Sequence, residues 1–237
     1  MSDTTPAIAQ ARPVADSATV AARKSFRLRV ILAFFAIYVI WGSTYLAIRY
    51  AVETIPPLYT AGFRHLTAGT ILLAWCFVKE LRPTWAQIRA SVVIGFFFFL
   101  LGHGSLHWAE TVVPSGLAAL LIAVEPIMVF LLSSAAARTW KLNGMLLAGI
   151  LLGLAGVGFL VMGTETHGAR GSTFGAIMVL VGALAWSIGI IYSRSSKLSG
   201  SPLLLSALSL LSGAVMLLTV GTLAGEAKGF SIAQVTP

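Results

Sequence analysis

The chain has 237 residues, of which 57% are hydrophobic and only 10% are charged, and its mean hydropathy is +0.90. Soluble domains carry roughly 25% charged residues, so this composition excludes an ordinary soluble globular protein. The net charge of +8 does not indicate nucleic-acid binding, because the sixteen Lys and Arg residues are scattered between apolar runs and form no dense basic stripe. A single cysteine, Cys76, excludes an intramolecular disulfide.

Residues 1–28 contain no apolar run and predict a disordered cytoplasmic tail. Seven apolar stretches follow, each long enough to cross a hydrocarbon core of about 30 Å. In chain order they cover residues 30–50, 58–78, 90–107, 113–136, 145–161, 174–192 and 203–223, and a polar tail, 224–237, comes after them. Because lipid forces each backbone polar group to be satisfied within its own segment, we predict an all-α, polytopic membrane helix bundle with about seven transmembrane helices.

Basic residues are distributed unevenly between the two sides of this bundle. With a cytoplasmic N-terminus, twelve of the sixteen fall on the inner side. They are Arg12, Arg23, Lys24, Arg27, Arg29, Lys79, Arg82, Arg89, Arg138, Lys141, Arg194 and Lys197. The opposite side carries only Arg49, Arg170 and Lys228. Cytoplasmic loops are enriched in basic residues, so we predict a multi-pass protein of the bacterial inner membrane with its N-terminus in the cytoplasm.

An internal repeat is visible at an offset of 145 residues. Trp41 and Arg49 of the first stretch correspond to Trp186 and Arg194 of the sixth, and the second stretch shifted by 145 lands on the seventh. The repeat unit is therefore five helices long, and an odd number of crossings makes the second copy inverted, as in many secondary transporters. Chance alignment is the alternative, because Trp and Arg both favour membrane interfaces.

This repeat predicts a domain organisation. Residues 29–163 form the first five-helix repeat, and residues 173–223 supply two helices of an inverted second copy. A complete second copy needs three more helices, so we expect that copy to be truncated or to be completed by a partner chain.

Four stretches of sequence carry a resemblance to a known family. They are WGSTYLAIRYA at 41–51, PPLYTAGFRHLTAG at 56–69, HWAETVVPSGLAALLIAVEPIMVFLL at 107–132 and GILLGLAGVGFLVMG at 149–163. In order and spacing they resemble EamA-type members of the drug/metabolite transporter superfamily. The resemblance implies ten helices in two inverted five-helix repeats and a metabolite as substrate.

Glu125 is the most informative single residue, because it lies near the middle of the fourth stretch with Pro126 beside it. An ionised acid at that depth costs several kcal/mol unless it faces the bundle interior or water. A substrate-cation or proton site and a structural hydrogen bond or ion pair are both open. Pro126 removes a backbone donor and can kink or unwind the helix at the same depth. This break is either a platform for substrate or an ordinary proline kink without a role in binding.

Arg64, followed by His65, lies about six residues into the second stretch. We expect a buried guanidinium that binds a substrate carboxylate, pairs with Glu125, or reaches outward to the interface. The resemblance adds that an arginine recurs at the matching position of the second helix in EamA-type proteins. Trp41, Ser43, Thr44 and Tyr45 are further substrate-binding candidates, against a lipid-facing or packing role for the two aromatic residues.

His103, His107 and Glu110 are spaced i, i+4 and i+7, which predicts one helical face. A zinc site is the weaker interpretation, because no water-activating partner can be named. The stronger interpretation is a hydrated pore mouth or a headgroup contact at the outer end of the third helix.

Together, residues and resemblance predict a secondary transporter that exports small metabolites such as amino acids by alternating access around a midplane site. We expect no enzyme activity and no cofactor. Direct ATP drive is not expected either, because the chain has no GxxxxGK[ST] loop. The expected partners are the lipid bilayer and a small-molecule substrate, with protons and a homo-oligomer left open. The alternative is a non-transporting membrane protein, or a truncated subunit that needs a partner chain.

Overall fold

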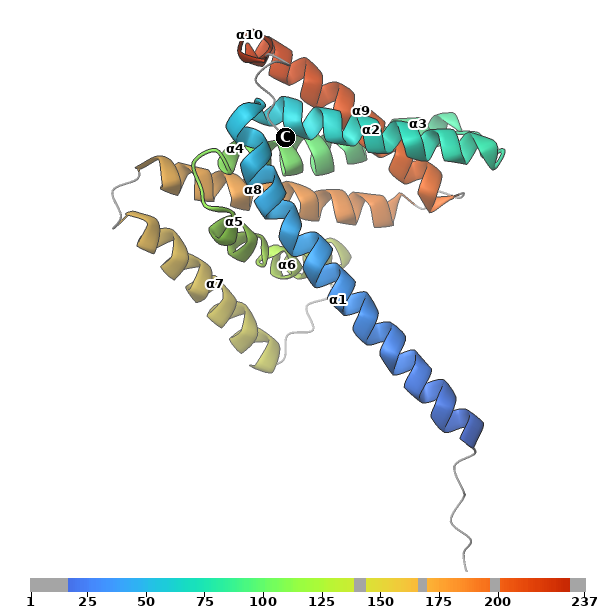
Figure 1. Cartoon of the computed structure of the whole chain (residues 1–237). Helices are drawn as coiled ribbons and strands as arrows, with labels where there is room; N and C mark the ends of the chain where they lie inside the picture. Colours follow the sequence, from blue (N-terminus) through green and yellow to red (C-terminus); the bar gives the residue numbers. More distant parts are fainter. Residues whose placement is uncertain (1–16, 139–143, 166–169, 197–200, 231–237) are drawn as a thin grey trace, which may run out of the picture. The chain divides into compact units, whose positions relative to one another are not determined.

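The computed structural model describes residues 17–138, 144–165, 170–196 and 201–230, and every regular element in these ranges is helical (Figure 1). The elements are α1 Ser17–Thr54, α2 Pro57–Val78, α3 Trp85–Gly95, η1 Phe96–His103, α4 Gly104–Ala109, α5 Ser115–Ile122, α6 Glu125–Ala137, α7 Gly144–Glu165, α8 Arg170–Ser195, α9 Pro202–Leu223 and α10 Glu226–Gly229. The predicted all-α fold class is confirmed.

In the described part of the chain, six helical segments are long and apolar enough to cross a membrane, and each corresponds to one predicted stretch. They are Phe26–Thr54, Pro57–Val78, Trp85–Ala109, Ser115–Ala137, Thr173–Ser195 and Pro202–Leu223. The remaining predicted stretch, 145–161, lies in α7. The apolar helix found there, Gly144–Phe159, is shorter than the six candidate membrane spans. The chain is therefore a polytopic membrane protein, as hydropathy predicts.

Contacts divide the chain into two units, residues 1–43 and 44–237, and α1 contributes residues to both. In the first unit the described residues all belong to α1. This helix begins at Ser17, so residues 17–28 of the predicted disordered tail are helical, consistent with their content of Ala, Arg and Lys. Residues 1–16 lie outside the described part of the chain.

In the second unit, the third membrane span (α3, η1 and α4) packs against both α8 and α9, and α2 packs chiefly against α9. Small residues allow these close contacts. A Cβ atom added to Gly182 of α8 would lie 2.9 Å from the carbonyl oxygen of Gly102 in η1, and one added to Gly62 of α2 would lie 2.7 Å from Leu218 of α9. Lipid gives helices no hydrophobic drive to associate, so such close packing stabilises the bundle.

The first residues of the predicted polar tail, 224–237, lie in the described part of the chain. Gly225 adopts a left-handed conformation with φ 88°, and the short helix α10 follows it. The Glu226 carboxylate accepts hydrogen bonds from the N–H groups of Leu58 (3.2 Å) and Tyr59 (3.0 Å) at the start of α2. The first N–H groups of a helix have no partner within it, so Glu226 caps α2.

Candidate functional site

The fourth membrane span is broken near its middle, where α5 ends at Ile122 and α6 begins at Glu125 (Figure 1). Across the break, the N–H groups of Ala123 and Val124 donate to carbonyls three residues back, at 3.2 Å each, instead of four. Pro126 has no N–H, so the Ile122 carbonyl loses the partner that a continuous helix would give it. The interruption leaves the end of one half-helix and the start of another at the same depth.

Glu125 is the first residue of α6 and is half-buried. Among the described residues, no hydrogen bond or ion pair reaches its carboxylate, and the alternative of an ion pair with Arg64 is not realised. Pro126, next to it, is exposed. The break coincides with the two residues predicted from the sequence, and their role in substrate binding stays a prediction.

The Arg64 side chain is exposed on α2, which agrees with the alternative in which it reaches outward and not with a buried guanidinium. The face of α2 that packs into the bundle carries Gly62, His65 and Gly69. His65, the neighbour of Arg64 in sequence, is only 3% exposed. The buried polar residue of α2 is therefore the histidine and not the arginine.

The four candidates of the first span fall in both units. In the first unit, Trp41 is exposed, and the Ser43 hydroxyl donates to the Ile40 carbonyl of its own helix at 3.1 Å. In the second unit, Thr44 is half-buried, and Tyr45 lies in an apolar core with Leu106, Ala109 and other side chains. Tyr45 thus has a packing role, and substrate contact by these four residues stays a prediction.

The third span contains a feature that the sequence did not predict, the π-helix η1. Its i to i+5 bonding places residues five apart on one side, and short π segments inside α-helices are frequent at functional sites. Phe98 and His103 both stack on Trp186 of α8, with ring centres 4.4 and 4.8 Å away and interplanar angles of 12° and 29°. His65 lies beside His103, with ring centres 4.8 Å apart and ring planes 18° apart. Phe98, Trp186 and His103 therefore form a ring stack between η1 and α8, and His65 of α2 lies at its edge.

Polar atoms connect this stack to the end of the span. His103 Nδ1 and His65 Nε2 are 2.7 Å apart and share a hydrogen bond. His107 Nδ1 donates to the His103 carbonyl at 2.8 Å, whereas His107 Nε2 is buried and has no partner in the described part of the chain. The same holds for both carboxyl oxygens of Glu110. Buried polar groups normally have a partner, so these three atoms indicate a missing donor.

The prediction of a hydrated pore mouth at His107 and Glu110 is wrong, because both side chains are fully buried. Among the residues with described coordinates, no group of three or more His, Cys, Asp or Glu side chains has a geometry suited to a metal ion. Arg49 donates to the backbone carbonyls of Glu110 and Thr111 and not to the carboxylate. Burial raises the pKa of Glu110 to about 8, although the Arg49 charge acts in the opposite direction.

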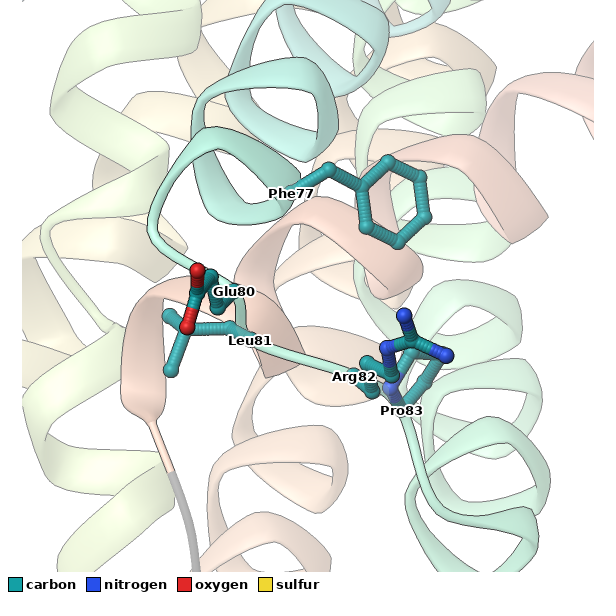
Figure 2. Close-up of a pocket in the computed structure, with 5 residues that line it drawn as sticks. All are labelled: Phe77, Glu80, Leu81, Arg82 and Pro83. Carbon is teal, nitrogen blue, oxygen red and sulfur yellow. The ribbon is translucent and has the colours of Figure 1, made fainter.

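One pocket, of about 840 Å³, lies at the turn between α2 and α3 (Figure 2). It is lined by Phe77, Glu80, Leu81, Arg82 and Pro83. The Glu80 and Arg82 side chains lie on opposite sides of this turn. None of the residues predicted to bind substrate lines the pocket, so it does not enlarge the candidate site.

Comparison with known proteins identifies the family. Residues 28–162, more than half of the chain, match the EamA-like transporter family. The chain belongs to this family. No solved structure matches the chain, so its comparison with relatives rests on sequence alone.

Three relatives illustrate the similarity. The uncharacterized inner membrane transporter YedA of Escherichia coli (strain K12) is 36% identical over 197 residues, which are 82% of this EamA-like chain and 62% of YedA. Protein PagO of Salmonella typhimurium is 31% identical over 73% of this chain and 57% of its own length. The uncharacterized transporter YoaV of Bacillus subtilis is 28% identical over 81% of this chain and 66% of its own length. The chain thus spans less than two thirds of each of these relatives.

Proposed function

We propose that the chain acts as a secondary transporter of the bacterial inner membrane that exports small metabolites such as amino acids by alternating access. Membership of the EamA-like transporter family and the similarity to YedA support a transport role in that membrane. The lipid bilayer and the substrate are its expected partners, and its N-terminus faces the cytoplasm by the distribution of basic residues.

The interruption between α5 and α6 carries the proposal. Secondary transporters use broken helices near the bilayer midplane, where half-helix N-termini attract anionic groups and unwound carbonyls bind cations. Here the α6 N-terminus and the Ile122 carbonyl meet at mid-span, and the Glu125 carboxylate beside them has no partner among the described residues. An amino acid carries one cationic and one anionic group, so both can be satisfied at this break.

The 145-residue offset supports the alternating-access part of the proposal. Under this offset α2 corresponds to α9, and these two helices pack directly against each other. Such a self-paired contact is expected at the pseudo-two-fold axis of an inverted repeat. Residues 29–163 would then be the first repeat and residues 173–223 the beginning of the second.

Within this proposal, Glu125 binds the substrate ammonium group, and Pro126 keeps the adjoining backbone open. Arg64 is exposed and therefore available to an approaching carboxylate, with Trp41, Ser43, Thr44 and Tyr45 as further candidates. Loss of a charge-assisted hydrogen bond costs about 1.5 to 3 kcal/mol, which corresponds to about 10- to 150-fold in affinity.

Counterflow in proteoliposomes tests the proposal. Vesicles with purified chain and preloaded with a mixture of unlabelled amino acids are expected to take up labelled amino acids faster than protein-free vesicles. Glu125→Gln should raise the half-saturating concentration about 10- to 150-fold. Glu80→Gln, on the exposed turn after α2, serves as the matched control. Absence of uptake by the unmodified chain, or equal uptake by both variants, would contradict the proposal.

A further inference from the structure

Four titratable side chains follow one another from the end of the third span into the bundle. Glu110, His107 and His103 share one helical face by their spacing, and His65 joins them from α2. The His103 and His107 ring centres are 6.0 Å apart, and the His65 and His103 nitrogens are in hydrogen-bond contact at 2.7 Å. These groups therefore form a row in which His65 and His103 are directly linked.

The outer half of this row is short of hydrogen-bond donors. His107 Nδ1 must carry a proton, because the carbonyl that it contacts can only accept. In the neutral ring Nε2 is then a bare acceptor. Among the described residues, neither this nitrogen nor either oxygen of Glu110 has a hydrogen-bond partner, although all three atoms are buried. A proton, alone or carried by water, supplies what these acceptors lack.

The hydrogen-bonded pair in the inner half of the row can share one additional proton. With one ring of the His65 and His103 pair charged and the other neutral, the charged ring donates and the neutral ring accepts. A second added proton would turn both facing nitrogens into donors and break the bond. The His103 ring also stacks on the face of Trp186 at 4.8 Å, within the range at which an indole stabilises a cation.

Few other charges face the row. Arg64 of α2 is near enough for its positive charge to disfavour a proton on each of the three rings, and Arg49 of α1 lies at Glu110. α5 and α9 contain no titratable residue, and those of α8 are Arg170, Tyr192 and Arg194, near its two ends. Apart from Arg64 and Arg49, we therefore expect the protonation of this row to depend mainly on its own four side chains.

We propose that Glu110, His107, His103 and His65 form a proton pathway in which the His65 and His103 pair holds the transported proton. That this proton drives substrate movement rests on the function proposed above. A proton released by the Glu110 carboxyl group reaches His107 Nε2 and leaves from the same nitrogen through water to His103 Nε2. The His103 Nδ1 proton then passes along the existing bond to His65 Nε2, so one proton enters the row and one arrives at its inner end.

A first test does not depend on transport. Nitrogen-15 NMR of the histidine-labelled chain in lipid nanodiscs follows its four histidines between pH 4 and 10, and single His→Gln variants assign each signal. We expect His65 and His103 to titrate together in one step, and His65→Gln to shift the signals of His103. The control His167→Gln should leave this step unchanged. Constant shifts of both rings over the whole range, or independent titration, would overturn the proposal.

A second test measures coupling in proteoliposomes with an enclosed pH-sensitive dye. The ratio of protons to labelled amino acids should fall at least 10-fold in His65→Gln and in His103→Gln, and should be retained in His167→Gln. An unchanged ratio in both variants, or a ratio that falls only in Glu125→Gln, would refute the pathway while transport itself stands. If the unmodified chain moves no amino acid, the proposed function fails, and the NMR titration still decides whether the row binds a proton.

Discussion

The close approach of α8 to η1 makes Gly182→Ala the most informative test of packing. Its new Cβ atom would lie 2.9 Å from the Gly102 carbonyl oxygen, and ordinary contacts begin at 3.4 Å, so the helices must separate by 3.4 − 2.9 = 0.5 Å. The neighbouring atom is backbone and cannot rotate away. Overpacking of this kind costs about 1 to 3 kcal/mol, or about 5- to 150-fold in the unfolding equilibrium constant.

Unfolding of the purified chain in mixed micelles with increasing SDS measures this difference. The matched control is Gly156→Ala in α7, where nothing lies within 4 Å of the new Cβ atom. This control should be neutral or more stable by up to about 1 kcal/mol, because alanine favours helix. Equal unfolding curves for the two variants would refute the close packing of α8 on η1. Because Phe98 and His103 stack on Trp186 of α8, Gly182→Ala should also perturb the His103 NMR signals.

Three further predictions concern single side chains. Glu226→Ala should lower the free energy of unfolding by about 0.5 to 2 kcal/mol in the same assay, because α2 loses its cap; no change would contradict the cap. The raised pKa of Glu110 means that the folded state binds a proton that the unfolded state has released, so stability should fall between about pH 4.5 and pH 8 and then level off. Glu110→Gln should remove this contribution, and an identical pH profile for both chains would refute it. Pro126→Ala should restore the N–H that reaches the Ile122 carbonyl, stabilise the fourth span and slow amino-acid counterflow; faster counterflow would contradict a role for the break.

Hydropathy predicts the membrane spans because lipid imposes length and composition on each of them. The break at Pro126 is also visible in the sequence, since a missing N–H has the same consequence in any helix. Which side of a membrane helix faces the bundle is harder to predict. Both faces of α2 are apolar, so Arg64 and His65 could not be assigned to lipid or core before the contact with α9 was known.

The π-helix and the ring stack depend on tertiary contacts that the sequence does not carry locally. Phe98 and His103 come together only because η1 and α8 approach closely at Gly102 and Gly182. The i, i+4, i+7 spacing of His103, His107 and Glu110 did indicate a shared face. The burial of His107 and Glu110 was missed, because polar residues at the end of a span are usually interfacial.

Counterflow of labelled amino acids by the unmodified chain and by Glu125→Gln, compared in the same vesicle preparation, tests the central claim most directly. For a transporter with its site at the α5 to α6 break, we expect the unmodified chain to take up more labelled amino acid than protein-free vesicles. The half-saturating concentration should be about 10- to 150-fold higher in Glu125→Gln. Uptake indistinguishable from that of protein-free vesicles, or equal affinity in both chains, would contradict the claim.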